Sequence, residues 1–344
     1  MFQLVIQTKD ATSEVLVGES YLNLSRHLPE NRQIIMVTDA HLRKHYHEFL
    51  DKYPIIEIGI GEQNKTIDTL QYIYERLLHF NADRNSFIVA VGGGIVCDVA
   101  GFAASTYMRG VPFGFVSTTL LSQVDASVGG KNGINFGGYK NMIGTFNQPR
   151  FVLCDPQMLQ TLPHKEFISG FAEIVKAAAI RDADFFTYLE QNAGRASERD
   201  PDVLLYLVTE SVKIKAKFVE QDEKEEGERR ILNFGHTFGH AIEILGGVSH
   251  GEAVSIGMMI AARWSAGECG FPCEQLDRLE QLLIRLGLPV VTQASVEEVF
   301  QGLVKDKKRE NEFIYLVLLN EIGKTEIQKT SIETIKEKLP AYIR

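Results

Sequence analysis

Cysteine is scarce in this chain, and the few cysteines are not paired. The 344 residues include four of them, Cys97, Cys154, Cys269 and Cys273, and no two are arranged as CxxC. This pattern indicates neither a disulfide framework nor a structural zinc knot. Cys97 and Cys154 lie beside apolar runs, so we expect both to be buried thiols.

Long apolar runs and an excess of positive charge are also missing. No uncharged apolar run reaches the ~20 residues that a membrane span requires, and MFQLVIQTKD at the start lacks the basic and apolar regions of a secretory signal. The formal net charge is -9, which disfavours a general nucleic-acid or membrane-surface binder but allows a locally cationic cleft. We therefore expect a cytoplasmic protein with neither kind of partner.

The sequence shows no internal repeat and no low-complexity linker, yet its texture changes near residue 155. Before that point, apolar strand-like segments alternate with helical patterns, and this alternation predicts a mostly parallel, Rossmann-like α/β sheet. The expected strands are 2–7, 13–18, 33–39, 54–60, 86–94, 113–118 and 150–155. After it, helical patterns follow one another at 164–180, 182–193, 201–220, 236–245, 251–268 and 273–286, before a small hairpin and a closing helix.

The length favours two domains over one. We predict a nucleotide-binding α/β domain over 1–155 and a mainly helical metal- and substrate-binding domain over 156–344, with the active site in the cleft between them.

Three short segments at predicted strand ends are candidates for nucleotide binding. Gly92-Gly93-Gly94 follows a strand and opens a helix, which lets backbone amides approach a phosphate. The GxGxxG pattern is not met, because residue 97 is cysteine, and an ordinary strand-to-helix turn is an equal alternative. Ser117–Thr119 ends another strand, at the edge where open α/β sheets bind ligands. Gly61–Lys65 ends a third, although alone it would be interpreted as a surface turn.

Residues 125–144 form a long turn-rich segment with six glycines, Lys131 and Lys140. A structureless stretch of this length in a compact domain is usually functional. Lysines on glycine turns favour binding of phosphate or carboxylate, and the alternative is an exposed loop.

Three histidines lie close together between residues 229 and 252. His236, His240 and Glu243 are spaced i, i+4 and i+7, so they share one side of a predicted helix. Gly246-Gly247 ends that helix, and His250 opens the next, so the chain can return His250 to the same place. Two imidazoles and a carboxylate suit a divalent ion of the zinc type, and the HExxH pattern of metalloproteases is absent. Packed core histidines are the alternative.

Glu173 lies among apolar neighbours in GFAEIVKAAAI, on a predicted helix with Lys176 at i+3. A surface ion pair would have this spacing. The apolar surroundings instead predict a buried carboxylate, which needs a partner such as a metal ion. Further along the chain, the charge run DEKEEGERR (222–230) is most simply a solvated loop, although Arg229 can point inward.

The motifs also occur in a recognisable order over about residues 55–325: GGGIVCDVAGFAASTYMRG, STTLLSQVDASVGGK, KNMIG, GFAEIVK, LNFGHTFGHAIE, HGEAVSIGM and DKK…IGK. In this order they resemble the 3-dehydroquinate synthase family of sugar-phosphate cyclases. The resemblance implies a homodimeric carbon–oxygen lyase that uses NAD+ and one divalent metal ion, zinc or cobalt.

The resemblance also assigns residues, and it changes the metal set that spacing favours. The implied ligands are Glu173, His236 and His250, while His240 faces the substrate. The residues implied for NAD are Glu62, Lys65, Gly93, Gly94, Asp98, Thr118, Thr119, Lys131, Lys140, Met158 and Thr161. Those implied for substrate and catalysis are Asp125, Lys131, Asn141, Lys176, Lys215, Arg229, Asn233 and His240, with Arg109 offered across the dimer interface to the substrate phosphate. Lys307 or Lys308 is expected to assist there.

The reaction implied is the second step of the shikimate pathway, which leads to chorismate and the aromatic amino acids. 3-Deoxy-D-arabino-heptulosonate 7-phosphate becomes 3-dehydroquinate and phosphate by transient oxidation with NAD+, phosphate elimination, re-reduction and an intramolecular aldol closure.

The alternatives are a metal-dependent polyol dehydrogenase, a related cyclase of secondary metabolism and a non-catalytic protein that kept the fold. The cluster of anion-binding lysines disfavours the dehydrogenase. Lys215 and Arg229 disfavour cyclases whose substrates lack a carboxylate, and the complete metal set disfavours the non-catalytic protein.

The sequence departs from the family pattern in a few places. Asn132 stands where threonine is frequent, FGGYKN replaces a proline-containing segment, and Ile60-Gly61 lacks a common aspartate. We expect a differently shaped loop around Lys140.

Overall fold

The computed structural model describes residues 1–9, 11–305 and 312–343, and the chain divides into two compact units. Unit 1 comprises Met1–Pro163 and Lys215–Lys224, and unit 2 comprises His164–Ile214 and Glu225–Arg344. The expected boundary at residue 155 differs from this division because Met158 belongs to the hydrophobic core of unit 1. Helix α6 (Pro201–Gln221) contributes to both units, since its residues from Lys215 onward belong to unit 1.

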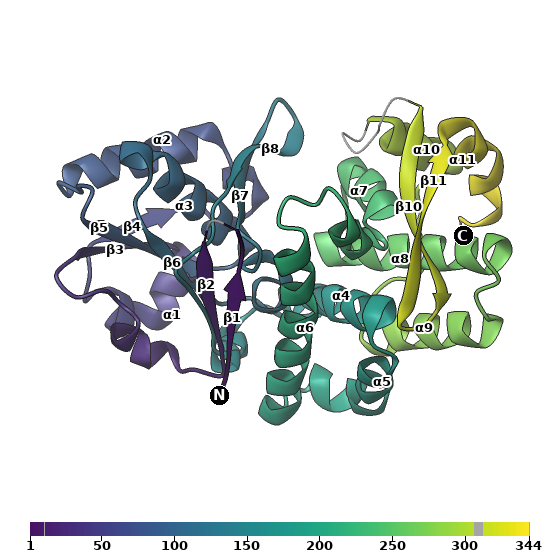
Figure 1. Cartoon of the computed structure of the whole chain (residues 1–344), viewed down its shortest axis with the longest axis horizontal. Helices are drawn as coiled ribbons and strands as arrows, with labels where there is room; N and C mark the ends of the chain where they lie inside the picture. Colours follow the sequence, from purple (N-terminus) through teal and green to yellow (C-terminus); the bar gives the residue numbers. More distant parts are fainter. Residues whose placement is uncertain (10, 306–311, 344) are drawn as a thin grey trace. The chain divides into compact units, whose positions relative to one another are not determined.

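A seven-stranded sheet organises unit 1, with strand order β1-β2-β9-β6-β5-β3-β4 (Figure 1). Only the β1–β2 pair is antiparallel among these strands, so the predicted mostly parallel α/β sheet is confirmed. Its strands are β1 (Phe2–Gln7), β2 (Thr12–Val17), β3 (Gln33–Asp39), β4 (Ile55–Ile58), β5 (Ser86–Gly92), β6 (Phe113–Ser117) and β9 (Phe151–Cys154). Every residue of β5, β6 and β9 is buried, as expected of parallel strands covered on both faces.

The helices of unit 1 are α1 (Ala40–Leu50), α2 (Ile67–His79) and α3 (Gly94–Thr106), and short helices η1 (Tyr21–Arg26), η2 (Glu62–Asn64), η3 (Tyr107–Arg109), η4 (Ser122–Ala126) and η5 (Pro156–Thr161) lie between the elements. Cys97 and Cys154 are buried thiols, as predicted.

The segment 125–144 is more ordered than the sequence suggests. Beyond η4 it enters an antiparallel hairpin of β7 (Lys131–Phe136) and β8 (Tyr139–Phe146), closed by Gly137 and Gly138 at φ of 60° and 82°. Glycine suits such a two-residue turn because it adopts positive φ without strain. A Cβ on Gly144 would lie 2.3 Å from the Asn132 carbonyl oxygen, so the glycines also allow the two strands to approach closely.

Unit 2 is mainly helical, as predicted from the sequence. Its helices are α4 (His164–Arg181), α5 (Ala183–Ser197), the first part of α6, α7 (His236–Leu245), α8 (His250–Glu268), α9 (Cys273–Arg285), α10 (Val296–Lys305) and α11 (Ile332–Lys338), with short helices η6 (Glu228–Asn233) and η7 (Leu339–Ala341). The predicted hairpin is present as β10 (Phe313–Glu321) and β11 (Lys324–Ser331). Helix α10 was not among the segments expected.

Glycines bring α7 and α8 into close contact. A Cβ on Gly257 would lie 2.0 Å from the Gly235 carbonyl oxygen, and one on Gly239 would lie 2.9 Å from that of Ala253. Larger residues would force the helices apart. The glycines therefore keep His236 and His250, which lie at the starts of the two helices, near each other. Within the part of the chain that the structure describes, no helix has the length and apolar character needed to cross a bilayer.

Candidate functional site

Helix α4 carries a buried ion pair at the centre of the site in unit 2. Glu173 and Lys176 are each only 2% exposed, and the Lys176 Nζ contacts Glu173 Oε2. Their neighbours on α4, from Phe171 to Ile180, are also buried. The pair is therefore internal, and the surface ion pair that the spacing alone allowed is excluded.

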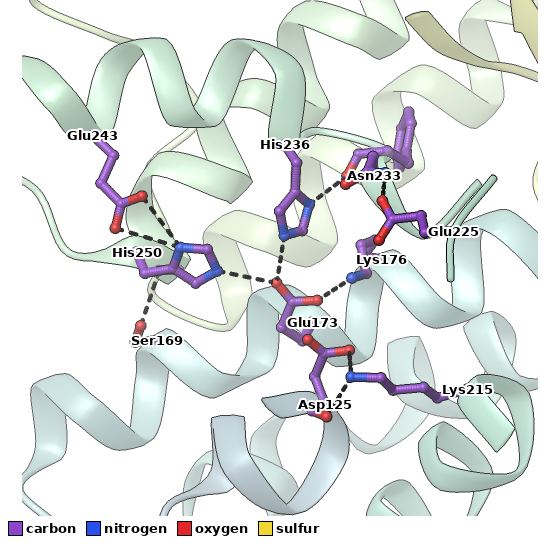
Figure 2. A network of polar contacts seen from close by, with 12 residues as sticks. Asp125, Ser169, Glu173, Lys176, Lys215, Glu225, Asn233, His236, Glu243 and His250 are labelled. Atoms are coloured by element: carbon purple, nitrogen blue, oxygen red, sulfur yellow. Dashed lines mark hydrogen bonds and ion pairs between the residues drawn. The ribbon is translucent and has the colours of Figure 1, made fainter. Parts of the chain in front are cut away.

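Two histidines converge on Glu173 from the starts of two other helices (Figure 2). The Nε2 atoms of His236 and His250 lie 3.4 Å and 3.5 Å from the same carboxylate oxygen, Oε1. His236 opens α7 after Gly235, whose φ of 78° lets the chain turn sharply into the helix. His250 opens α8, whose start is stabilised by a capping box between Ser249 and Glu252.

The second ring nitrogen of each histidine points to an oxygen on the other side. Nδ1 of His236 lies 3.3 Å from the carbonyl oxygen of Phe234, and Nδ1 of His250 lies 3.4 Å from the carboxylate of Glu243. Both rings therefore direct Nε2 toward Glu173.

Burial and charge shift the pKa values of these three groups in different directions. Burial lowers the pKa of His236 to about 3, although Glu173 opposes the shift. Burial also disfavours the charged form of His250, but hydrogen bonds to Glu173 and Glu243 outweigh it and raise its pKa to about 9. Burial alone would raise the pKa of Glu173, yet Lys176 and the two histidines hold it well below its ordinary value.

The three side chains fit a divalent metal ion. One ligand atom from each of Glu173, His236 and His250 lies within 4.8 Å of the others. Both Glu173 oxygens are buried: Oε2 contacts the Lys176 ammonium group, and Oε1 faces Nε2 of both His236 and His250. A buried carboxylate oxygen that faces two imidazole nitrogens is the donor set of a zinc-type site that keeps a coordination position open.

The ligand pair favoured by helical spacing is not supported by this geometry. His236 and His240 do share one side of α7, with ring centroids 5.3 Å apart. A second candidate group joins His240 and Glu243 to His250, so neither group combines His236 with His240. The assignment implied by the resemblance agrees better with the convergence of His236 and His250 on Glu173 Oε1, and metal binding itself stays a prediction.

The chain before α7 adds polar groups in the same unit. Arg229 is 2% exposed and therefore points inward, while Asn233 Nδ2 donates to Glu225 Oε1. The other residues of 222–230 are half-buried or exposed, so the segment agrees with the expected solvated loop in which Arg229 points inward. Glu225 adopts φ of 62°, an uncommon conformation for a residue other than glycine. Glu225 was not expected among these polar groups because it lies within the charge run DEKEEGERR.

Unit 1 contains a second polar cluster at the carboxyl ends of its strands. The buried Lys65 donates to Asp98, on α3, and to Asn141 Oδ1 at 2.6 Å, on β8. Burial raises the pKa of Asp98, and Lys65 opposes that rise. Glu62 accepts a hydrogen bond from Asn135 at 2.8 Å and lies 3.9 Å from Lys140 Nζ. The structure therefore brings together most of the charged side chains that the resemblance implies for NAD.

The glycine turn before α3 packs against the end of β6. A Cβ on Gly93 would lie 2.7 Å from Thr119 Cγ2, and one on Gly94 would lie 3.1 Å from Ala126 Cβ. The Thr118 amide donates to the Gly92 carbonyl at 3.0 Å. This close packing leaves backbone and small side chains at the start of α3, where a phosphate is favoured.

Lys215 is placed by α6 next to Asp125, both within unit 1. Its Nζ lies 2.8 Å from Asp125 Oδ1 and also donates to the Asp125 carbonyl.

Lys131 opens β7 with an exposed side chain. Thr161 accepts or donates a hydrogen bond with Tyr46 at 2.9 Å.

Two predicted residues lie in less expected surroundings. The Met158 side chain is buried in the core of unit 1, and its carbonyl oxygen accepts a hydrogen bond from Thr161 Oγ1 at 3.2 Å. Arg109 is exposed at φ of 68°, directly after Met108 at 50°. Lys307 and Lys308 lie outside the described residues.

Comparisons with known proteins identify the same family over both halves of the chain. Models described as 3-dehydroquinate synthase N-terminal and C-terminal match residues 55–169 and 170–309. A 3-dehydroquinate synthase of Dictyoglomus turgidum is 40% identical over 98% of this chain and 96% of its own length. One from Geobacter sp. (strain M21) is 48% identical over 79% of this chain and 76% of its own.

Solved structures with the same fold include two other cyclases. A 2-deoxy-scyllo-inosose synthase complexed with carbaglucose-6-phosphate, NAD+ and Co2+ has a TM-score of 0.89 and 27% identity, covering 99% of this chain and all of its own. A 2-epi-5-epi-valiolone synthase from Streptomyces hygroscopicus with NAD+ and Zn2+ bound has a TM-score of 0.88 and 27% identity, covering 98% of each chain. An iron-containing alcohol dehydrogenase from Thermotoga maritima shares only the fold, at 18% identity, a TM-score of 0.66, and coverage of 96% and 97%.

Proposed function

This chain belongs to the 3-dehydroquinate synthase family, and we propose that it converts 3-deoxy-D-arabino-heptulosonate 7-phosphate into 3-dehydroquinate and phosphate. The single observation that carries the proposal is the buried Glu173 carboxylate, which faces Nε2 of both His236 and His250 and has Lys176 beside it. A site of this kind suits a metal ion that binds the hydroxyl groups of a sugar-like acid.

Two bound groups complete the chemistry in this proposal. NAD+ would supply a hydride acceptor and donor at C5, and a zinc or cobalt ion held by Glu173, His236 and His250 would polarise the C5 oxygen. Both groups occur together in related cyclases. We propose that the cluster around Lys65 and Asp98 holds the cofactor.

The remaining residues would bind and orient the substrate. Lys176, Lys215 and Arg229 carry buried positive charge, which pairs with carboxylate or phosphate and explains how a chain of net charge -9 binds a multiply charged anion. His240 would exchange a proton with the C5 hydroxyl, and the leaving phosphate would accept the C6 proton. Fixing one flexible substrate for successive steps can itself supply much of the acceleration.

The proposal extends to assembly and location. Arg109 would reach the phosphate of the partner's substrate in a homodimer, and the protein would act in the cytoplasm. Sedimentation analysis together with Arg109→Ala tests the first part. A dimer whose variant keeps full phosphate release would contradict the role of Arg109.

The direct test mixes metal-loaded protein with substoichiometric NAD+ and the heptulosonate phosphate, and follows phosphate and 3-dehydroquinate together. We expect equal amounts of both products, and loss of both with a chelator or in His250→Ala. Steady NADH formation from polyols without phosphate release would instead favour the dehydrogenase. Turnover of glucose 6-phosphate or sedoheptulose 7-phosphate alone would favour a related cyclase.

A further inference from the structure

The ring of His250 lies between two carboxylates that belong to different helices (Figure 2). On one side, Nε2 lies 3.5 Å from Glu173 Oε1 on α4. On the other side, Nδ1 lies 3.4 Å from both carboxylate oxygens of Glu243 on α7. The Glu243 side chain is 8% exposed, so its charge is largely removed from water. A buried carboxylate requires compensating partners, and the His250 ring is one of them.

We propose that Glu243 is a positioning residue, which accepts the Nδ1 proton of His250 and so holds the ring with Nε2 directed at the metal. This inference rests on the metal role in the proposed function. A neutral imidazole carries one proton, and a hydrogen bond from Nδ1–H leaves the lone pair on Nε2. Carboxylates that accept from the far nitrogen of a metal-bound histidine fix both its tautomer and its orientation.

The other histidine shows why His250 needs such a partner. His236 has the carbonyl oxygen of Phe234 near its Nδ1, two residues away in the same chain segment. Among the described residues, the hydrogen-bond partner of His250 Nδ1 is instead a side-chain carboxylate, that of Glu243. The His236 ring is thus oriented by its own backbone, whereas the orientation of the His250 ring depends on residue 243.

The position of Glu243 in the sequence places its carboxylate where it can contact His250. Glu243 follows His236 by seven residues on α7, so the two share one side of the helix. Gly246 and Gly247, with φ of 84° and 86°, then turn the chain back to His250. One helix therefore supplies a candidate ligand at its start and the positioning group for the other candidate near its end.

Glu243 could alternatively be a ligand itself, together with His240 and His250. Such a site would have to use Nδ1 of His250, the nitrogen that faces away from Glu173. The convergence of Nε2 of His236 and Nε2 of His250 on Glu173 Oε1, at 3.4 Å and 3.5 Å, would then serve no metal ion. The geometry therefore favours positioning over ligation.

The test measures zinc affinity of the full chain by competition with a chromophoric chelator, and the absorption spectrum of the Co2+ form, without substrate. Glu243→Ala should bind zinc about 10- to 100-fold more weakly. Glu243→Gln keeps an oxygen that can accept from Nδ1, so it should recover part of the affinity. In both variants the Co2+ spectrum should keep the band intensity of the wild-type coordination number.

Glu252→Gln is the matched control. It removes one negative charge two residues from His250, but the Glu252 carboxylate accepts from the Ser249 amide and does not touch the ring. Zinc affinity of this variant should stay within a few-fold of wild type. A loss as large as in Glu243→Ala would mean that local charge, not contact with Nδ1, matters, and the proposal would be wrong.

Two further results would overturn the proposal. Unchanged zinc affinity in Glu243→Ala would remove any positioning role. An affinity as low as that of His250→Ala, with a Co2+ spectrum that reports a lost ligand in Glu243→Gln, would make Glu243 a ligand. Unfolding measured with a chelator present shows whether each variant is folded. If Glu243→Ala is not folded, Glu243→Gln takes its place as the test variant. Because no substrate is present, failure of 3-dehydroquinate formation would leave this result intact.

Discussion

Replacing Lys176 by methionine would leave the Glu173 carboxylate in the interior without its closest cation. Both residues are 2% exposed, so water cannot take the place of the lost ammonium group. Removing one partner of a buried ion pair typically costs about 3–5 kcal/mol. His250, charged below its pKa of about 9, lies 3.5 Å from Glu173 and offsets part of this cost. We expect a loss near the lower limit, about 3 kcal/mol.

A double-mutant cycle isolates the interaction free energy of Glu173 and Lys176 from the effect of each substitution alone. Glu173→Gln leaves the Lys176 ammonium buried and should cost a similar amount. The double variant Glu173→Gln/Lys176→Met buries neither charge, so it should be less destabilised than the sum of the single variants by about 2 kcal/mol or more. Arg195 and Asp200, an exposed pair 2.9 Å apart, provide the comparison, with a coupling of about 0–1 kcal/mol.

The assay is urea unfolding with a chelator present, followed by a probe in unit 2 such as the fluorescence of Trp264, the single tryptophan of the chain. In thermal unfolding, 3 kcal/mol corresponds to about 6–12 °C for a unit of this size. Added zinc should stabilise the wild type and Lys176→Met, because the ion takes over the role of the ammonium group. It should stabilise Glu173→Gln much less. Additive losses in the cycle, or a cost below about 1 kcal/mol for Lys176→Met, would refute the reasoning.

Three further predictions concern other parts of the chain. Gly251→Ala should lower the free energy of unfolding of unit 2 by about 2 kcal/mol or more, measured in urea, because its Cβ would lie 2.0 Å from the Ser169 carbonyl oxygen. A chromogenic thiol reagent should label the exposed Cys273 in the native protein but reach Cys154 only after denaturation, since burial raises the pKa of that thiol above its ordinary range. His240→Ala should abolish product formation yet retain zinc within a few-fold of wild-type affinity in chelator competition, and a loss matching that of a ligand variant would contradict its assignment to substrate.

The alternation of strands and helices in the first half was a reliable guide because each segment carries its own periodicity. The burial of every residue in β5 matches a run, SFIVAVG, that contains little but apolar residues. The hairpin of β7 and β8 was harder to predict from the sequence. Its glycines indicate a loop when the sequence is considered alone, whereas in the structure Gly133 and Gly144 allow two strand backbones to lie close together. That reason depends on a partner strand and cannot be read from one segment.

The boundary between the units differs from the expected one for a similar reason. The expected division followed the last predicted strand, because long helical patterns come after it. The Met158 side chain lies beyond that point in the sequence, yet it packs into the core of unit 1. Lys215 shows the same limit, because α6 is a single helix by periodicity and only tertiary contacts assign its last part to unit 1.

Helical spacing indicated the helix that carries several candidate residues but could not choose among them. His236 and His240 lie on one side of α7 with nearly equal claims as ligands, and their local sequences do not distinguish them. The distinction arises from α4, which places the Glu173 carboxylate 3.4 Å from His236, and from α8, which brings His250 to the same oxygen. Glu243 likewise shares that side of the helix, yet its two oxygens face the far nitrogen of His250. A periodicity selects a face, whereas the role of each residue on that face depends on what the other helices present to it.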